Sequence, residues 1–255
     1  MVDSRAIRGA RARGCPCDGL ETGAARRRGD ADGEATVTSQ MDALAIADWR
    51  RHIAELYAEV RRASATDPAA AHATWRAERE ALFRGHPASP VPVGEREGFR
   101  ALHWPYDDGW RRTAEMETAA GSAAGPGAAG GGIPSIAFVP ASVGAPPPLE
   151  LAGQVALALP GGTARLPVLQ LLEYAGGLFL PFGDATNGGA TYGAGRYLLD
   201  TAKGADLGVT AGGALILDFN FAYQPSCAFD PRWACPLAPP EAHLALAVEA
   251  GERIR

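Results

Sequence analysis

Apolar positions early in the chain recur with the period of a helix. Between residues 42 and 62 they stand three and four positions apart, which places them on one stripe of an amphipathic helix. The stripe consists of Ile46, Trp49, Ile53, Leu56 and Val60. A second helix is predicted from Asp67-Pro68, an N-cap residue followed by proline at the first helical position, to Gly85.

From Phe99 onward the pattern changes to short apolar runs bounded by turn residues. The predicted strands are 110–116, 136–139, 155–159, 165–172, 178–182, 192–199, 215–219 and 245–249. No helix-length pattern separates them, so a parallel α/β sheet is not expected. We expect a mainly β fold, an antiparallel barrel or sandwich, with two N-terminal α-helices packed against it.

Composition divides the chain into three parts. Residues 1–40 hold seven arginines and six acidic residues with few large apolar side chains. We interpret them as a disordered N-terminal extension, or as a start of translation placed ahead of the true one at Met41. Residues 41–98 form the helical segment and residues 99–255 the β-rich domain, in which the glycine-rich stretch 119–132 is expected to be a disordered loop.

Charge and hydropathy exclude several classes of function. The formal net charge is -5, which does not provide the basic face typical of a nucleic-acid-binding protein. No apolar run is long enough to span a membrane, and the basic N-terminus lacks the apolar core of a signal peptide. We therefore expect a cytoplasmic protein with no nucleic-acid or membrane partner. No cofactor is predicted, because the YGAGRY string lacks the lysine and the strand–helix context of a nucleotide loop.

Polar side chains gather in a glycine-rich stretch at residues 181–200. They include Asp184, Thr186, Thr191, Tyr192, Arg196 and Tyr197 among five glycines. Such side chains can converge on a ligand, or they can cap tight turns through hydrogen bonds to the backbone. We expect at least some of them to bind a ligand.

A second stretch, residues 215–231, is an apolar run that ends in Asp218 and Asn220. Because Phe219 lies between them, the two polar side chains share one face of the predicted strand. They can hold a metal, orient a water or pair with Arg196. An Asp218–Arg196 pair that only braces the mouth of the β domain is an equally good interpretation.

A third stretch, residues 227–244, contains two cysteines. Seven residues separate Cys227 from Cys235, which is not the spacing of a zinc finger. With Glu241 and His243 they could form a four-ligand metal site, or they could form a disulfide. The interpretation we favour is two buried free thiols beside aromatic rings, and no bound metal.

These stretches resemble the bacterial domain-of-unknown-function 1684 family, from about Trp49 to Arg253. The resemblance is carried by Trp49-Arg50, HPASP (86–90), DAT (184–186), TYGAGRY (191–197), DFN (218–220), AYQP (222–225), CA (227–228), CPL (235–237), PPE (239–241) and AGE (250–252). It implies a conserved β-rich domain with no established activity, so it supplies no catalytic residue. The family usually has asparagine where this chain has Gln224 and Ala242.

Three hypotheses for function follow from the residues. The first is a small-molecule-binding β domain with a pocket for a polar or anionic molecule. Its ligand-binding residues would be Thr186, Thr191, Tyr192, Arg196, Tyr197, Asn220 and Tyr223. The second is a hydrolase or lyase in which Asp184 or Asp218 is the general base. The third is a structural or partner-binding domain in which the polar cluster is a conformational latch.

Overall fold

The computed structural model describes residues 31–118, 140–144, 147–172 and 176–254, with side chains from residue 42 onward. The chain divides into two compact units, Met1–Ser39 and Gln40–Arg255. In the first unit the described residues 31–39 are helical. The predicted loop at 119–132, the predicted strand at 136–139 and residues 1–30 of the predicted extension lie outside the described residues.

Two α-helices form where the apolar stripe and the capping residues predict them. Helix α1 runs over Ala31–Ala63, so it begins before the predicted start, and helix α2 runs over Pro68–Gly85. The Asp67 side chain caps α2 by accepting a hydrogen bond of 2.9 Å from the Ala70 amide. The predicted stripe is buried at Ile53, Leu56 and Val60, whereas Ile46 is exposed. No helix among the described residues is long and apolar enough to cross a membrane.

The described strands pair antiparallel in three sheets, and isolated bridges lie outside them. The largest sheet has the order β3-β4-β5-β6-β7, from Met116–Glu117, Leu149–Leu159, Gly162–Leu171, Gly177–Phe182 and Arg196–Asp200. Strand β2 (Arg111–Ala114) pairs with β8 (Leu215–Asp218), and β1 (Leu102–His103) pairs with β9 (Glu252–Arg253). Short 3-10 turns lie at Val93–Glu95, Asp108–Trp110, Thr201–Lys203, Phe219–Phe221, Ser226–Ala228 and Pro240–Ala242. No pairing closes a described sheet, so the fold is sandwich-like and the predicted barrel alternative is wrong.

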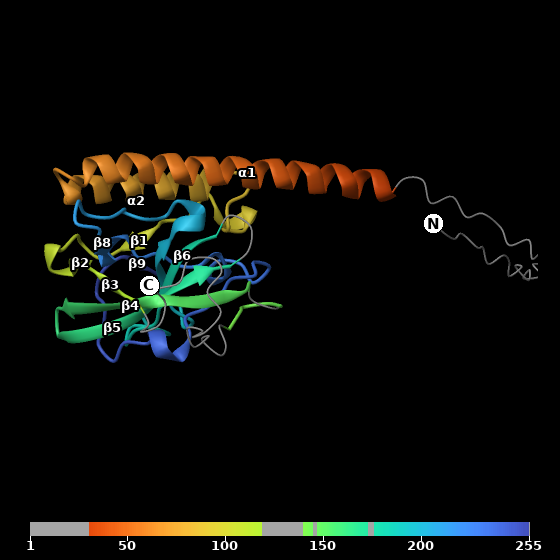
Figure 1. The fold of residues 1–255 in the computed structure, drawn as a ribbon. Coiled ribbons are helices and arrows are strands. Elements are labelled where there is room, and N and C mark those ends of the chain that lie inside the picture. The colour runs from red at the N-terminus through yellow and green to blue at the C-terminus, as the bar shows by residue number, and fades with distance from the viewer. Residues whose placement is uncertain (1–30, 119–139, 145–146, 173–175, 255) are drawn as a thin grey trace, which may run out of the picture. The chain divides into compact units, whose positions relative to one another are not determined.

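The five-stranded sheet buries apolar side chains on both faces. One face packs against β2, β8 and the 219–221 turn; this core includes Trp110, Val155, Leu166, Leu180, Phe182, Leu217 and Phe219. The other face packs against the helices, in a cluster that includes Ile53, Leu56, Val60, Trp75, Leu169, Phe179 and Tyr197. Within the second unit the two helices lie together over the β elements (Figure 1). The predicted packing of two N-terminal helices against a β fold is confirmed.

Two predicted strands differ from the structure. Residues 245–249 form no strand; Arg196 donates to the carbonyl oxygen of Val248 within this segment and to that of Ala250 just after it. The predicted strand at 192–199 begins only at Arg196, because Gly195 adopts a left-handed φ of 95°. A Cβ at Gly195 would lie 2.5 Å from the Phe182 carbonyl oxygen, so glycine permits the close approach of these two chain segments.

Candidate functional site

Arg196, the first residue of β7, is buried and joins three segments of the chain. Its Nη2 lies 2.9 Å from the Asp184 Oδ2, and both side chains have no exposed surface. The same nitrogen donates to the Val248 carbonyl at 2.9 Å, and Nη1 donates to the Ala250 carbonyl. We call this arrangement of Arg196, Asp184 and the two carbonyls the clasp. Neither Arg196 nor Asp184 lines the pocket described below.

The polar residues around Asp184 mostly hold the loop together. The Asp184 carboxylate accepts from the Thr186 amide at 2.7 Å, and the Asp184 amide donates to the Asn187 side chain at 2.6 Å. The Thr186 and Thr191 hydroxyls lie 2.8 Å apart, and Asn187 Nδ2 donates to Thr191 at 3.0 Å. These contacts are those of side chains that cap a tight turn.

Asp218 lies in a separate cluster from the clasp. Its Oδ2 is 3.2 Å from Arg111 Nη1, and its Oδ1 accepts from Asn220 Nδ2 at 2.8 Å. Asn220 is itself bonded to the Asp107 backbone, donating to its carbonyl at 2.9 Å and accepting from its amide at 3.1 Å. The predicted Asp218–Arg196 pair is therefore wrong: each charge is buried, but each has a different partner.

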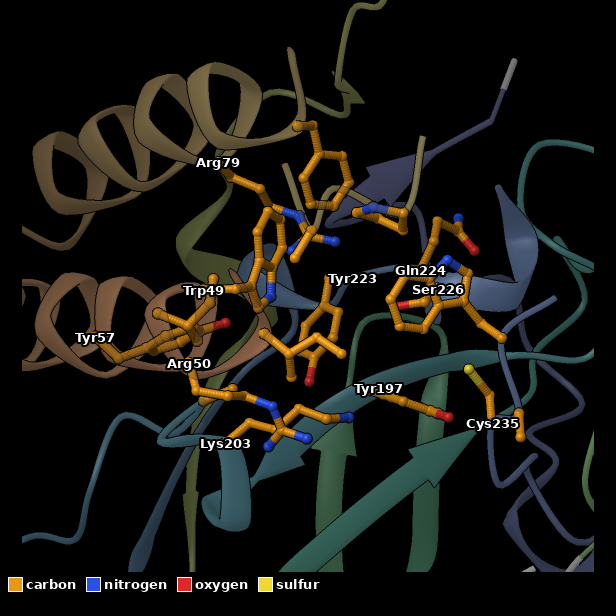
Figure 2. Close-up of a pocket in the computed structure, with 18 residues that line it drawn as sticks. Trp49, Arg50, Tyr57, Arg79, Tyr197, Lys203, Tyr223, Gln224, Ser226 and Cys235 are labelled. Atoms are coloured by element: carbon orange, nitrogen blue, oxygen red, sulfur yellow. The ribbon is translucent and has the colours of Figure 1, made fainter. Parts of the chain in front are cut away.

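A pocket of about 170 Å³ lies where α1 and α2 meet the β domain (Figure 2). Aromatic, cationic and small side chains line it; they include Trp49, Arg50, Tyr57, Arg79, Phe83, Tyr197, Lys203, Tyr223, Gln224, Ser226, Trp233 and Cys235. Of the residues predicted from the sequence, Tyr197, Tyr223 and Cys235 lie on this wall. The predicted residues away from this wall are Asp184, Thr186, Thr191, Tyr192, Arg196, Asp218, Asn220, Cys227 and His243.

Three cationic side chains line the pocket wall. They are Arg50, Arg79 and Lys203, and no carboxylate is among the described residues of the wall. Arg79 Nη2 lies 2.9 Å from Glu252 Oε2, while Lys203 Nζ lies 2.6 Å from Asp200 Oδ2. Neither carboxylate lines the pocket, but each is paired with its cation, so Arg50 is the lining cation that has no ion pair among the described residues.

Tyr223 presents an unused hydroxyl at this pocket. The oxygen is buried and has no hydrogen-bond partner among the residues that the structure describes. Burial raises the pKa of Tyr223 well above its usual value, so the hydroxyl keeps its proton and remains a donor. The Arg79 guanidinium lies 4.9 Å from the centre of the Tyr223 ring. Figure 2 shows the Tyr223 side chain among Trp49, Tyr197 and the other lining residues.

The sequence-based prediction missed the helical half of this wall. The sequence pattern places Trp49 on the core-facing stripe of α1 and does not predict Tyr57 as a site residue. Arg79 is the clearest signal of this wall in the sequence. It stands four residues after Trp75 and four before Phe83, so it occupies a core-facing position of α2 despite its charge.

Of the two cysteines, Cys235 lies on the pocket wall and Cys227 does not. Both are buried free cysteines, with no disulfide between them. Interaction with the Cys235 thiol and burial raise the pKa of Cys227, whereas interaction with the Cys227 thiol lowers the pKa of Cys235. Burial together with the Cys227 thiol raises the pKa of Tyr192 to about 12.

Possible metal ligands gather elsewhere in the described part of the chain. Asp48, His52 and His86 each offer a ligand atom within 4.8 Å of the others, whereas Cys227, Cys235 and His243 form no such group. The hydrogen bonds of His86 do not suit a metal. Its Nδ1 accepts from the Ala88 amide at 3.0 Å, so in the neutral ring Nε2 carries the proton and lies 3.2 Å from Asp48. A metal-bound histidine ordinarily donates from its second nitrogen, which is the reverse arrangement.

Comparison with known proteins identifies the family. None of the curated proteins matches the chain. A solution NMR structure of an uncharacterized protein from gene locus rrnAC0354 of Haloarcula marismortui is similar, with 26% identity and a TM-score of 0.46 over 70% of this chain and 89% of that one. A family model described as "Protein of unknown function (DUF1684)" matches residues 97–253, more than half of the chain, but not Trp49-Arg50 or HPASP. The chain therefore belongs to the DUF1684 family.

Proposed function

We propose that this protein binds a small anionic molecule with one planar ring in the pocket between its helices and its β domain. The observation that carries the proposal is the chemistry of the wall. Arg50 lines it with no ion pair among the described residues, and the Tyr223 hydroxyl there is buried without a partner in the same part of the chain. A carboxylate or phosphate on the ligand would supply the missing acceptor and counter-charge.

The size of the pocket limits the ligand. Cavities of about 150 Å³ hold one benzene molecule, whereas drug-sized ligands need roughly 300 Å³ or more. The space here is about 170 Å³. Trp49, Tyr57 and Trp233 supply flat apolar surface. A single aromatic ring with one acidic group fits both the volume and the wall.

The enzyme hypothesis has less support from the geometry. A general base needs a free lone pair within reach of the substrate. Asp184 and Asp218 are both buried, accept hydrogen bonds from several donors and lie off the pocket wall. The contacts of the clasp favour a structural role for Asp184 and Arg196. That role supports the latch hypothesis for those two residues and leaves the pocket to bind the ligand.

A thermal-shift experiment tests the proposal with benzoate and its uncharged analogue benzamide. A ligand at a hundred times its Kd adds about 2.7 kcal/mol of stability, which raises Tm by roughly 5–10 °C in a chain of this size. We expect benzoate to stabilise the protein, benzamide to stabilise it much less, and Arg50→Met to remove the difference. Arg62→Met is the matched control, because Arg62 is an exposed cation of α1 away from the wall. Equal shifts for both compounds, or no shift with either, would overturn the proposal.

A further inference from the structure

Two carboxylates outside the pocket wall each hold one of its cations. Glu252 Oε2 is 2.9 Å from Arg79 Nη2, and these side chains are 1% and 7% exposed. Asp200 Oδ2 is 2.6 Å from Lys203 Nζ, in a more open pair, because 36% of the lysine side chain is exposed. Neither carboxylate is part of the wall. A ligand in the pocket can therefore contact the two cations without contacting the carboxylates that neutralise them.

The Arg79–Glu252 pair is held on several sides. Glu252 Oε2 also accepts a hydrogen bond of 2.7 Å from the Gln224 amide. The Arg79 guanidinium carbon lies 4.3 Å from the centre of the Phe83 ring and 4.9 Å from the centre of the Tyr223 ring. If the guanidinium turned to another partner, it would leave a buried carboxylate unpaired, which is strongly unfavourable. We therefore expect this pair to stay together when a ligand binds.

Five side chains therefore set the charge balance of the pocket. Arg50, Arg79 and Lys203 contribute three positive charges, and Glu252 and Asp200 contribute two negative ones, so one positive charge is left. A ligand with one negative charge makes the whole assembly neutral. A second negative charge on the ligand would lie near the two carboxylates without a cation of its own, and a charge in that position weakens binding.

We propose that the pocket selects a monoanion, such as a carboxylate, over a dianion, such as a phosphate, and that Glu252 and Asp200 set this preference from outside the wall. The inference rests on the proposed anion pocket and narrows its ligand to a ring with a single negative charge. Glu252 acts through Arg79 and Asp200 acts through Lys203. Removal of either carboxylate would leave a second positive charge available to the ligand.

Two ligands of the same shape and different charge test the preference. At pH 8.5 benzenesulfonate carries one negative charge, whereas phenylphosphonate mostly carries two. Their dissociation constants for the full-length protein are measured by calorimetry at low salt, which limits screening, with benzoate as the reference monoanion. We expect benzenesulfonate to bind about tenfold more tightly than phenylphosphonate, the order of magnitude for one uncompensated charge near a protein surface.

Asp200→Asn and Glu252→Gln each remove one negative charge and keep the size of the side chain. Each should shift the ratio of the two dissociation constants about tenfold in favour of phenylphosphonate. Asp200→Asn is the deciding variant, since the partly exposed Lys203 can be hydrated when its partner is lost, whereas Glu252→Gln leaves a buried arginine without its counter-charge. Glu117→Gln is the matched control, because Glu117 and its partner Arg165 are exposed and off the wall.

The ratio of the two constants separates charge from shape. A variant that only deforms the pocket weakens both ligands and leaves the ratio unchanged. A ratio that Asp200→Asn moves no further than Glu117→Gln does would overturn the role of the carboxylates. Binding of benzoate together with equal or tighter binding of phenylphosphonate to the parent would overturn the monoanion preference alone. No binding of any of the three anions would overturn the proposed function as well.

Discussion

Lowering the pH from 7 to 5 is expected to destabilise the fold through two histidines between α2 and the β domain. His72 packs against Trp75, Phe221 and the ring of His103, with ring centres 5.1 to 5.9 Å apart. Nε2 of each histidine is buried without a hydrogen-bond partner among the described residues. Burial is the main cause that lowers the pKa of His72 to about 3 and that of His103 to about 4.

The size of the effect follows from proton binding in the two states. An unfolded histidine has a pKa of about 6.5, so at pH 5 the unfolded chain protonates both rings while the folded protein protonates almost neither. The contribution of each ring is intact above pH 6.5 and is lost as the pH falls towards its folded pKa. Each ring therefore lowers the free energy of unfolding by about 2 kcal/mol at pH 5 relative to pH 7, and the two rings together lower it by about 4 kcal/mol. That loss is a large part of the free energy of unfolding of a typical protein, which is about 5–15 kcal/mol.

Urea unfolding at several pH values between 5 and 7 measures this loss. The variants His72→Phe and His103→Phe keep a flat ring at each position but bind no proton. The slope of the free energy of unfolding against pH reports how many protons the chain takes up on unfolding. In each single variant this number should be smaller than in the parent by about one, and in the double variant by about two. Subtracting the slope of each variant from that of the parent removes the contribution of every other titrating group. A parent and double variant with the same pH dependence would refute the reasoning.

Three further predictions concern stability and are checked by urea unfolding at pH 7. Arg196→Met leaves the buried Asp184 carboxylate without its counter-charge and should lower the free energy of unfolding by about 3–5 kcal/mol. The control Arg165→Met breaks an exposed ion pair and should cost less than about 1 kcal/mol. Equal losses in the two variants would contradict a structural clasp. Gly195→Ala should cost at least about 2 kcal/mol through its left-handed φ and close contact, and tolerance of alanine would show that the local backbone differs. Asp67→Ala should cost about 1 kcal/mol by removing the cap of α2, and Asp67→Asn should restore most of it.

Much of the fold was predictable because its elements carry local signals. The stripe of α1 and the Asp67-Pro68 start of α2 depend only on neighbours in the sequence, and both predictions are confirmed. The predicted strand at 245–249 failed for a non-local reason. The carbonyls of Val248 and Ala250 accept hydrogen bonds from Arg196, about fifty residues earlier in the chain. The hydrophobic periodicity of the segment contains no information about that contact.

The candidate site was only partly predictable for the same reason. Composition located the polar stretches that contain Asp184, Arg196 and Asp218, but it could not assign partners among several acids and arginines. The structure pairs Arg196 with Asp184 and Asp218 with Arg111. The pocket was harder to find, because half of its wall comes from α1 and α2 and the other half from residues more than a hundred positions later.

The clasp also bears on the order of events during synthesis. Arg196 needs the carbonyls of Val248 and Ala250, and strand β1 needs β9 at Glu252–Arg253. A ribosome therefore releases most of the β domain before the residues that complete it have been made. Until then the Arg196 charge lacks these two acceptors and the sheet partner of β1 is missing. At about 5–20 residues per second the nascent chain therefore carries an incomplete clasp for roughly 3–10 s.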